Sequence, residues 1–201
     1  RKVVEPVLQK DAGSLFYINL SQDHFKIGGS SFAQILNMVG SEVPTVNHAS
    51  SIKTVFNAIQ QLISEEKIAA GHDVASGGLI TTLLEMCFAN ECLGAEIDLT
   101  GLSEKDSVKI LFAENCGIVF QAKNDLEVSQ FLSEKNIAFH NLGKVSSEER
   151  LAIKNGADLF TFSIPETRDA WYKTSYLLDQ KQTANQLAKT RYSNYKSQPL
   201  H

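Results

Sequence analysis

Residues 68–79 read Ile-Ala-Ala-Gly-His-Asp-Val-Ala-Ser-Gly-Gly-Leu, which joins a short apolar run to a glycine pair and the start of an apolar stripe. The run Ile68–Val74 has the length of a strand and is followed by glycines, which predicts a buried strand. A helix over about 77–91 comes next, because apolar residues recur at helical spacing, at Leu79, Ile80, Leu83, Leu84, Cys87 and Phe88. The stretch therefore predicts a strand–turn–helix unit of an α/β protein, with Asp73 at the end of the strand.

Segments of the same two kinds alternate along the rest of the chain. A helix over about 48–66 is predicted by one apolar face, formed by Ile52, Val55, Phe56, Ile59, Leu62 and Ile63. Ser103 and Asp106 resemble a capping pair for a helix that reaches Phe112. Other predicted helices are Phe32–Val39, Leu126–Lys135 and a region from Pro165 onward; other predicted strands are Ser14–Leu20, Ala95–Leu99, Gly117–Ala122, Ala138–Val145, Leu151–Lys154 and Leu159–Ile164. Because the last strands are adjacent, a mixed sheet covered by helices fits better than a parallel one.

The composition is that of an average globular protein. The chain has 201 residues, 43% of them hydrophobic and 21% charged, which fits one domain or at most two small ones and excludes disordered, collagen-like and coiled-coil chains. No apolar run is long enough to cross a membrane. The net charge of −4 gives no sign of nucleic-acid binding. From Lys181 onward there are four basic residues and no acidic ones, and we interpret this tail as a solvated or linker-like surface.

The three cysteines, Cys87, Cys92 and Cys116, are odd in number and show no C-x-x-C spacing. This pattern favours reduced thiols in a cytoplasmic protein over a disulfide framework or a zinc site. Cys116 has no basic neighbour in the sequence, so we expect a buried and inert thiol. The first residues contain neither a secretory signal nor an initiator Met, so we expect a chain cut from a longer protein.

The segment that follows the predicted strand has the ingredients of a phosphate site. Helix N-terminal amides attract phosphate, and Gly77 and Gly78 let the backbone approach it closely. Asp73 is suited to Mg²⁺, which prefers oxygen ligands. Helix capping and turn formation explain the same residues, however, and both interpretations stay open. His72 on its own is expected to be a packed, hydrogen-bonded histidine rather than a base or ligand.

Two further segments carry a weaker signal of the same kind. Gly28, Gly29 and Ser30 precede a predicted helix and suit either an anion cradle or, as we favour, a tight turn. Glu114 follows a helix whose C-terminal dipole disfavours a carboxylate, which indicates some other reason for its presence. The chain contains no P-loop, G-x-G-x-x-G, H-E-x-x-H or G-x-S-x-G signature.

Five segments together resemble the large phosphoribosylformylglycinamidine synthases (FGAM synthases). Lys26–Gln34 resembles their "LGGS-x-LAQ" segment, and His72–Leu79 resembles "HD-x-SDGGL". Leu84–Ala89 is similar to "LAEMAFA", and Leu111–Asn115 to "LFNEE". Trp171 with Thr174-Ser175 resembles a Trp…Thr-Ser element of the same region. Each motif is weak alone, but all five occur in the family's order over about 12–177.

The resemblance implies a fold and a domain arrangement. It identifies the chain with the second C-terminal domain of the aminoimidazole ribonucleotide synthetase-like core, a three-layer α/β/α fold (α/β, or α+β in some schemes) with a mixed sheet. Residues 1–11 would be a linker from a preceding domain, and 12–177 the domain itself. Residues 178–201 would be a basic tail toward a glutaminase domain.

The resemblance also implies an activity. Large FGAM synthases use ATP and glutamine to convert formylglycinamide ribonucleotide (FGAR) to formylglycinamidine ribonucleotide (FGAM) in purine biosynthesis. Their Mg²⁺-binding Asp falls on Asp73, and ATP or ADP would contact His72, Ala75, Ser76, Gly77, Gly78, Gly28, Gly29 and Ser30. No catalytic residue is assigned here. The expected partners are the N-terminal synthetase-like and glutaminase domains and small-molecule substrates, with no nucleic acid or membrane.

Two departures from the family pattern leave alternatives open. Ala75 stands where the family has a nucleotide-contacting Ser, and Ser76 where it has Asp. The first hypothesis is a domain that contributes to a Mg–nucleotide half-site and is inactive alone. The second is a structural scaffold domain with a degenerate nucleotide site. A third, a relative such as a thiamine-phosphate kinase or selenophosphate synthetase, is disfavoured by the "LGGS"- and "LFNEE"-like segments.

Overall fold

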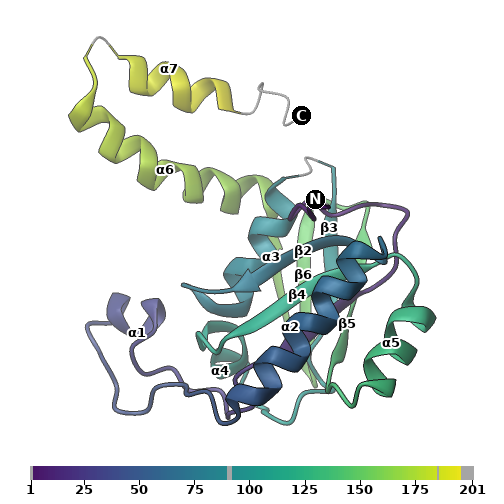
Figure 1. Ribbon diagram of the computed structural model, residues 1–201. Coiled ribbons are helices and arrows are strands. Elements are labelled where there is room, and N and C mark those ends of the chain that lie inside the picture. Colours follow the sequence, from purple (N-terminus) through teal and green to yellow (C-terminus); the bar gives the residue numbers. More distant parts are fainter. Residues whose placement is uncertain (1, 90–91, 185, 196–201) are drawn as a thin grey trace.

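The computed structural model describes residues 2–89, 92–184 and 186–195. Its centre is a seven-stranded mixed sheet in the order β2-β4-β1-β5-β3-β6-β7. Figure 1 shows this sheet between the helices. The parallel pair is β3–β6, and the other neighbours are antiparallel. The strands are β1 (Leu15–Asn19), β2 (Ile68–Val74), β3 (Gly94–Asp98), β4 (Gly117–Ala122), β5 (His140–Ser146), β6 (Arg150–Asn155) and β7 (Asp158–Ser163). The predicted mixed sheet is confirmed.

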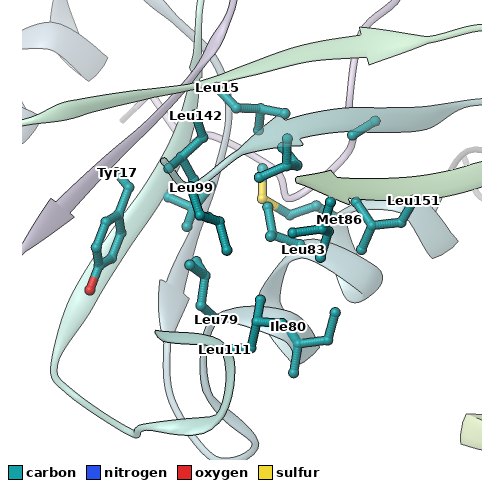
Figure 2. Close-up of a cluster of buried hydrophobic side chains, with 14 of the residues drawn as sticks. Leu15, Tyr17, Leu79, Ile80, Leu83, Met86, Leu99, Leu111, Leu142 and Leu151 are labelled. Atoms are coloured by element: carbon teal, nitrogen blue, oxygen red, sulfur yellow. The ribbon is translucent and has the colours of Figure 1, made fainter. Parts of the chain in front are cut away.

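Helices cover both faces of the sheet and give the expected three layers. One face packs on α2 (Ala49–Ser64) and α5 (Asp125–Glu134), through a cluster that includes Val55, Leu62 and Val128. The other face packs on α3 (Gly78–Phe88) and α4 (Ser107–Phe112), and Figure 2 shows part of that cluster. The three-layer α/β/α prediction is therefore confirmed.

The central strand β1 shows why both layers form. Its side chains alternate between the two faces. Leu15 and Tyr17 enter the α3–α4 cluster, whereas Phe16 and Ile18 enter the α2–α5 cluster. All four are at most 2% exposed. A strand that is apolar on both faces must be covered on both, and that requirement places helices on either side of the sheet.

Three details differ from the sequence predictions. In α2 the predicted apolar face is too wide, because Phe56 is 57% exposed and the buried stripe is Val55, Ala58, Ile59 and Leu62. Helix α1 (Ser31–Ile35) ends before the predicted Val39, and the chain turns through Asn37 at a φ of 55°. In α4 the cap is Asp106 alone, which accepts from the amides of Val108 and Lys109, so Ser103 takes no part in it.

The two ends of the chain extend the domain. In the segment before β1, Leu8 is buried, and Gln9 donates its amide to the Gln121 side chain at 2.9 Å. At the other end, α6 (Ile164–Gln182) runs continuously through the predicted boundary at 177 and forms a hairpin with α7 (Leu187–Asn194) (Figure 1). No helix among the described residues is long and apolar enough to span a membrane.

Candidate functional site

The segments that the sequence analysis singles out lie together at one end of the strands, which is called this edge of the sheet below. Strand β2 ends at Val74, opposite Gly117 at the start of β4, and Gly117 is also opposite Asn19 at the end of β1. The turn that leads into α3 therefore lies at this edge, next to the connection that precedes β4. Ligands of open α/β sheets bind at such strand ends.

The turn itself needs its two glycines for steric reasons. Gly77 and Gly78 have φ values of +87° and +74°, the left-handed region that favours glycine. A Cβ on Gly78 would lie 2.6 Å from the carbonyl oxygen of Leu111. The Gly78 amide donates to the Ala75 carbonyl at 3.0 Å and closes the turn. Within the described residues no hydrogen bond uses the amides of Ala75 or Ser76, and both residues are exposed.

Glu114 joins this turn to the other glycine segment. Its Oε1 atom accepts from the amides of Gly77 and Ser31, each at 2.8 Å. Burial opposes ionisation of the half-buried carboxyl, but the hydrogen bonds from Gly77 and Ser31 outweigh it and hold the pKa of Glu114 below its usual value. The carboxylate therefore occupies the Gly77 amide, which the sequence analysis proposed as a phosphate contact. The same hydrogen bonds explain why a Glu is present after a helix whose dipole disfavours it.

The segment at Gly28–Ser30 forms a closed loop. Gly28 donates its amide to the Glu42 carbonyl at 2.8 Å, and Gly29 donates to the Val39 carbonyl at 2.6 Å. The Ser30 hydroxyl accepts from the Ala33 amide and caps α1. The backbone amides of Gly28 and Gly29 therefore already have partners within the protein, which favours the turn interpretation over an anion cradle.

His72 is packed rather than open. Its Nδ1 lies 2.7 Å from the Asp73 carbonyl oxygen and its Nε2 lies 3.3 Å from Oε2 of Glu85. Glu85 in turn accepts from the Trp171 indole at 3.1 Å. The sequence prediction of a hydrogen-bonded histidine agrees with this arrangement. The sequence analysis did not predict Glu85 as the partner of His72. The position of Glu85 in the "LAEMAFA"-like segment could have indicated it.

Asp73 has the exposure of a ligand but not a complete metal site. Its side chain is 77% exposed, and its Oδ1 atom lies 3.5 Å from Nδ1 of His72. Among the described residues no three His, Cys, Asp or Glu side chains converge to hold a metal ion. Asp73 fits one coordination position of Mg²⁺, which usually keeps several waters and takes phosphate oxygens as well.

The cysteines agree with one prediction and contradict another. No disulfide joins Cys87, Cys92 or Cys116, as expected. Cys116, however, is exposed, so the prediction of a buried thiol is wrong. The reason is its position: it lies in the connection before β4, where its carbonyl, but not its side chain, bonds the amides of Leu20 and Ser21. Partial desolvation and the nearby Asp73 carboxylate raise the pKa of the Cys116 thiol.

Comparison with known families assigns this architecture to a class. Residues 16–155 match the model of the AIR synthase related protein, C-terminal domain. The chain therefore belongs to the family of AIR synthase related C-terminal domains.

Two relatives of this chain carry the name phosphoribosylformylglycinamidine synthase. The chain is 35% identical over 159 residues to a "Probable phosphoribosylformylglycinamidine synthase" of Caenorhabditis elegans, which covers 73% of this chain. It is 31% identical over 187 residues, 90% of this chain, to a "Probable phosphoribosylformylglycinamidine synthase, chloroplastic/mitochondrial" of Arabidopsis thaliana. The chain spans only 12% and 13% of these two relatives.

Solved structures show the same fold at low sequence identity. T. maritima PurL, solved in complex with FGAR, has a TM-score of 0.64 and 16% identity, over 83% of this chain and 29% of that one. The same protein in complex with ATP gives a TM-score of 0.61 and 14% identity, over 82% of this chain and 27% of the other. These likenesses establish the fold of the domain.

Proposed function

We propose that this chain is a domain of an FGAM synthase, the ligase that uses ATP and glutamine to convert FGAR to FGAM in purine biosynthesis. The five ordered motifs, the family match and the names of two relatives support this proposal. Because the chain spans about an eighth of those relatives, catalysis belongs to the full-length protein. The synthetase-like and glutaminase domains would complete it, and the isolated chain is expected to be inactive.

The role proposed for this domain is one half of a Mg–nucleotide site at the β2–α3 turn. The observation that carries it is the exposed Asp73 carboxylate, which only Val74 separates from the turn. Ala75 and Ser76 in this turn are exposed, and their amides make no hydrogen bonds in the described part of the chain. These two amides can donate to phosphate oxygens. Bound Mg²⁺ would neutralise phosphate charge. The complex of T. maritima PurL with ATP is consistent with a nucleotide site in proteins of this fold.

A test in the full-length parent compares two charge-removing variants. Asp73→Asn is expected to lower the nucleotide and Mg²⁺ that copurify with the protein, because a metal-ligand charge is lost. Asp158→Asn, in an exposed position of β7, is the matched control and should change neither. Copurified nucleotide is measured by absorbance and chromatography, Mg²⁺ by elemental analysis, and FGAM formation from FGAR alongside. Unchanged nucleotide content in Asp73→Asn would contradict the half-site.

A second candidate is a scaffold domain with a degenerate site. It is favoured by Ala75, which has no hydroxyl, and by the Gly77 amide, which Glu114 already occupies. In that case Asp73→Asn leaves both nucleotide content and turnover unchanged while the parent remains an active FGAM synthase. A parent that folds but forms no FGAM would refute both candidates. A cytoplasmic location stays a prediction based on the reduced thiols.

A further inference from the structure

The chain covers one of the two outermost strands of its sheet and leaves the other open. Strand β2 is outermost on one side, and the segment before β1 runs along it. The Gly71 amide donates to the Glu5 carbonyl at 3.1 Å. The Gln9 side chain donates to the Ala69 carbonyl, also at 3.1 Å. Strand β7 is outermost on the other side, and in the described part of the chain it pairs with β6 alone.

Strand β7 has none of the features that usually protect an outermost strand. Such strands are typically very short, or they carry lysine, proline or a bulge. β7 reads Asp-Leu-Phe-Thr-Phe-Ser, its pairing with β6 is continuous, and its one charged residue is Asp158 at the turn. Leu159 is 71% exposed, and Thr161 is exposed as well. An open strand with apolar and β-branched side chains is a template for pairing with another chain.

Hairpin geometry shows which groups of β7 face outward. Strands β6 and β7 are joined by a two-residue turn between the paired residues Asn155 and Asp158. Such a closing pair exchanges hydrogen bonds, and bonded and non-bonded pairs then alternate along the ladder. The main-chain N–H and C=O groups of Leu159 and Thr161 therefore face away from β6. Among the described residues, no hydrogen bond outside the β6–β7 ladder uses these groups.

These outward groups fit a second copy of the same strand. In an antiparallel pair with its two-fold axis at Phe160, Leu159 of each copy lies opposite Thr161 of the other and about four main-chain hydrogen bonds form. A pairing centred on Thr161 would use Ser163 instead, whose carbonyl already accepts from the Thr167 hydroxyl at 2.7 Å. The axis at Phe160 is therefore favoured, because it uses only the two outward-facing residues.

The side chains also match in this pairing. The Phe160 rings of the two copies would face each other across the axis, next to the core cluster on which each already packs. Aromatic pairs of this kind stabilise neighbouring strands. Asp158 would lie opposite Phe162, so the one charge of β7 meets no like charge. The strand is therefore complementary to itself in hydrogen bonding and in charge.

We propose that β7 pairs with β7 of a second copy of this chain and joins the two seven-stranded sheets into one continuous sheet. The pairing uses up the outer side of β7, and the segment before β1 already occupies the outer side of β2 in each copy. The assembly therefore stops at two copies. The contact contains no residue of the proposed nucleotide half-site, so the proposal is independent of that function.

The test measures mass in solution by analytical ultracentrifugation, for the 201-residue chain and for the full-length protein. A contact of one strand pair is small, so we expect a dimer with a Kd on the order of 10 μM. The double variant Leu159→Lys, Thr161→Lys places like charges opposite each other and should weaken the dimer about tenfold or more. Thr54→Lys, Asn57→Lys, at exposed positions of α2, is the matched control and should leave the dimer unchanged.

A charge exchange separates pairing from a general effect of the substitutions. The double variant Leu159→Glu, Thr161→Glu should also be weakened as a dimer, because it too opposes like charges. An equimolar mixture of the lysine and glutamate variants should form a heterodimer, because each lysine then lies opposite a glutamate. Circular dichroism checks that every variant is folded, and the recovery of pairing in the mixture confirms it.

Several outcomes would overturn the proposal. They are a 201-residue chain that stays monomeric up to about 1 mM, open-ended aggregates in place of a dimer, and a mixture of the two variants that stays monomeric. A full-length protein that is monomeric where the 201-residue chain pairs would overturn it as well, because another part of that protein then covers β7. None of these outcomes concerns the formation of FGAM, so failure here leaves the FGAM synthase proposal intact.

Discussion

Replacing Glu114 by alanine tests whether one carboxylate holds the candidate site together. The substitution leaves the amides of Ser31 and Gly77 without their partner. A hydrogen bond to a charged group contributes about 1.5–3 kcal/mol, so two such bonds set an upper bound of about 6 kcal/mol. Glu114, Ser31 and Gly77 are only half-buried, so water replaces part of the loss. We expect the free energy of unfolding to fall by about 2–3 kcal/mol.

The assay is urea unfolding followed by circular dichroism at pH 7. Glu134→Ala, an exposed helix position, is the matched control and should stay within about 0.5 kcal/mol of the parent. Glu114→Gln keeps an acceptor oxygen but loses the charge, so its loss of unfolding free energy should lie between those of Glu114→Ala and Glu134→Ala. If Glu114→Ala destabilises no more than Glu134→Ala, the bridge contributes nothing and the reasoning fails.

The same carboxylate gives a pH dependence with a definite sign. The pKa of Glu114 is lower in the folded protein, so its contribution is fully present above the ordinary glutamate value, roughly 4.3. It is lost as the pH falls through the lower folded-state pKa. The stability difference between the parent and Glu114→Gln should therefore shrink as the pH is lowered from 6 to 3.

Two other predictions concern the same edge of the sheet. Gly78→Ala should destabilise the protein by about 2 kcal/mol or more, because position 78 has a left-handed backbone and the new Cβ would approach the Leu111 carbonyl closely. Thermal unfolding measures this loss, and an unchanged stability would mean that the turn can relax. Cys87 is buried with its pKa raised to about 12, so a thiol reagent should label Cys92 and Cys116 in the native protein and Cys87 only after unfolding. Because the pKa of the Cys116 thiol is raised, its labelling should still accelerate above the ordinary thiol pKa of roughly 8.5. Rapid native labelling of Cys87 would contradict the packing of α3.

Local periodicity explains what the sequence could predict. The alternation in β1 and the stripe of α3 each depend on residues within one element, so strand and helix positions followed directly from spacing. Contacts between distant segments have no such pattern. The bridge from Glu114 to Ser31 and Gly77 spans 83 and 37 positions, and only the folded chain shows that one carboxylate serves both. The exposure of Phe56 and Cys116 depends in the same way on what the rest of the chain covers.

The Glu114 bridge also decides how portable the His72–Leu79 motif is. A short binding loop can be transferred to a new scaffold when its own residues determine its conformation. Here the turn takes part of its shape from Glu114, and steric room for Gly78 depends on the backbone of Leu111. A graft that carried the eight residues alone would leave both behind. The smallest transferable unit at this edge therefore combines that turn with residues 111–114, two pieces of chain that are separate in sequence.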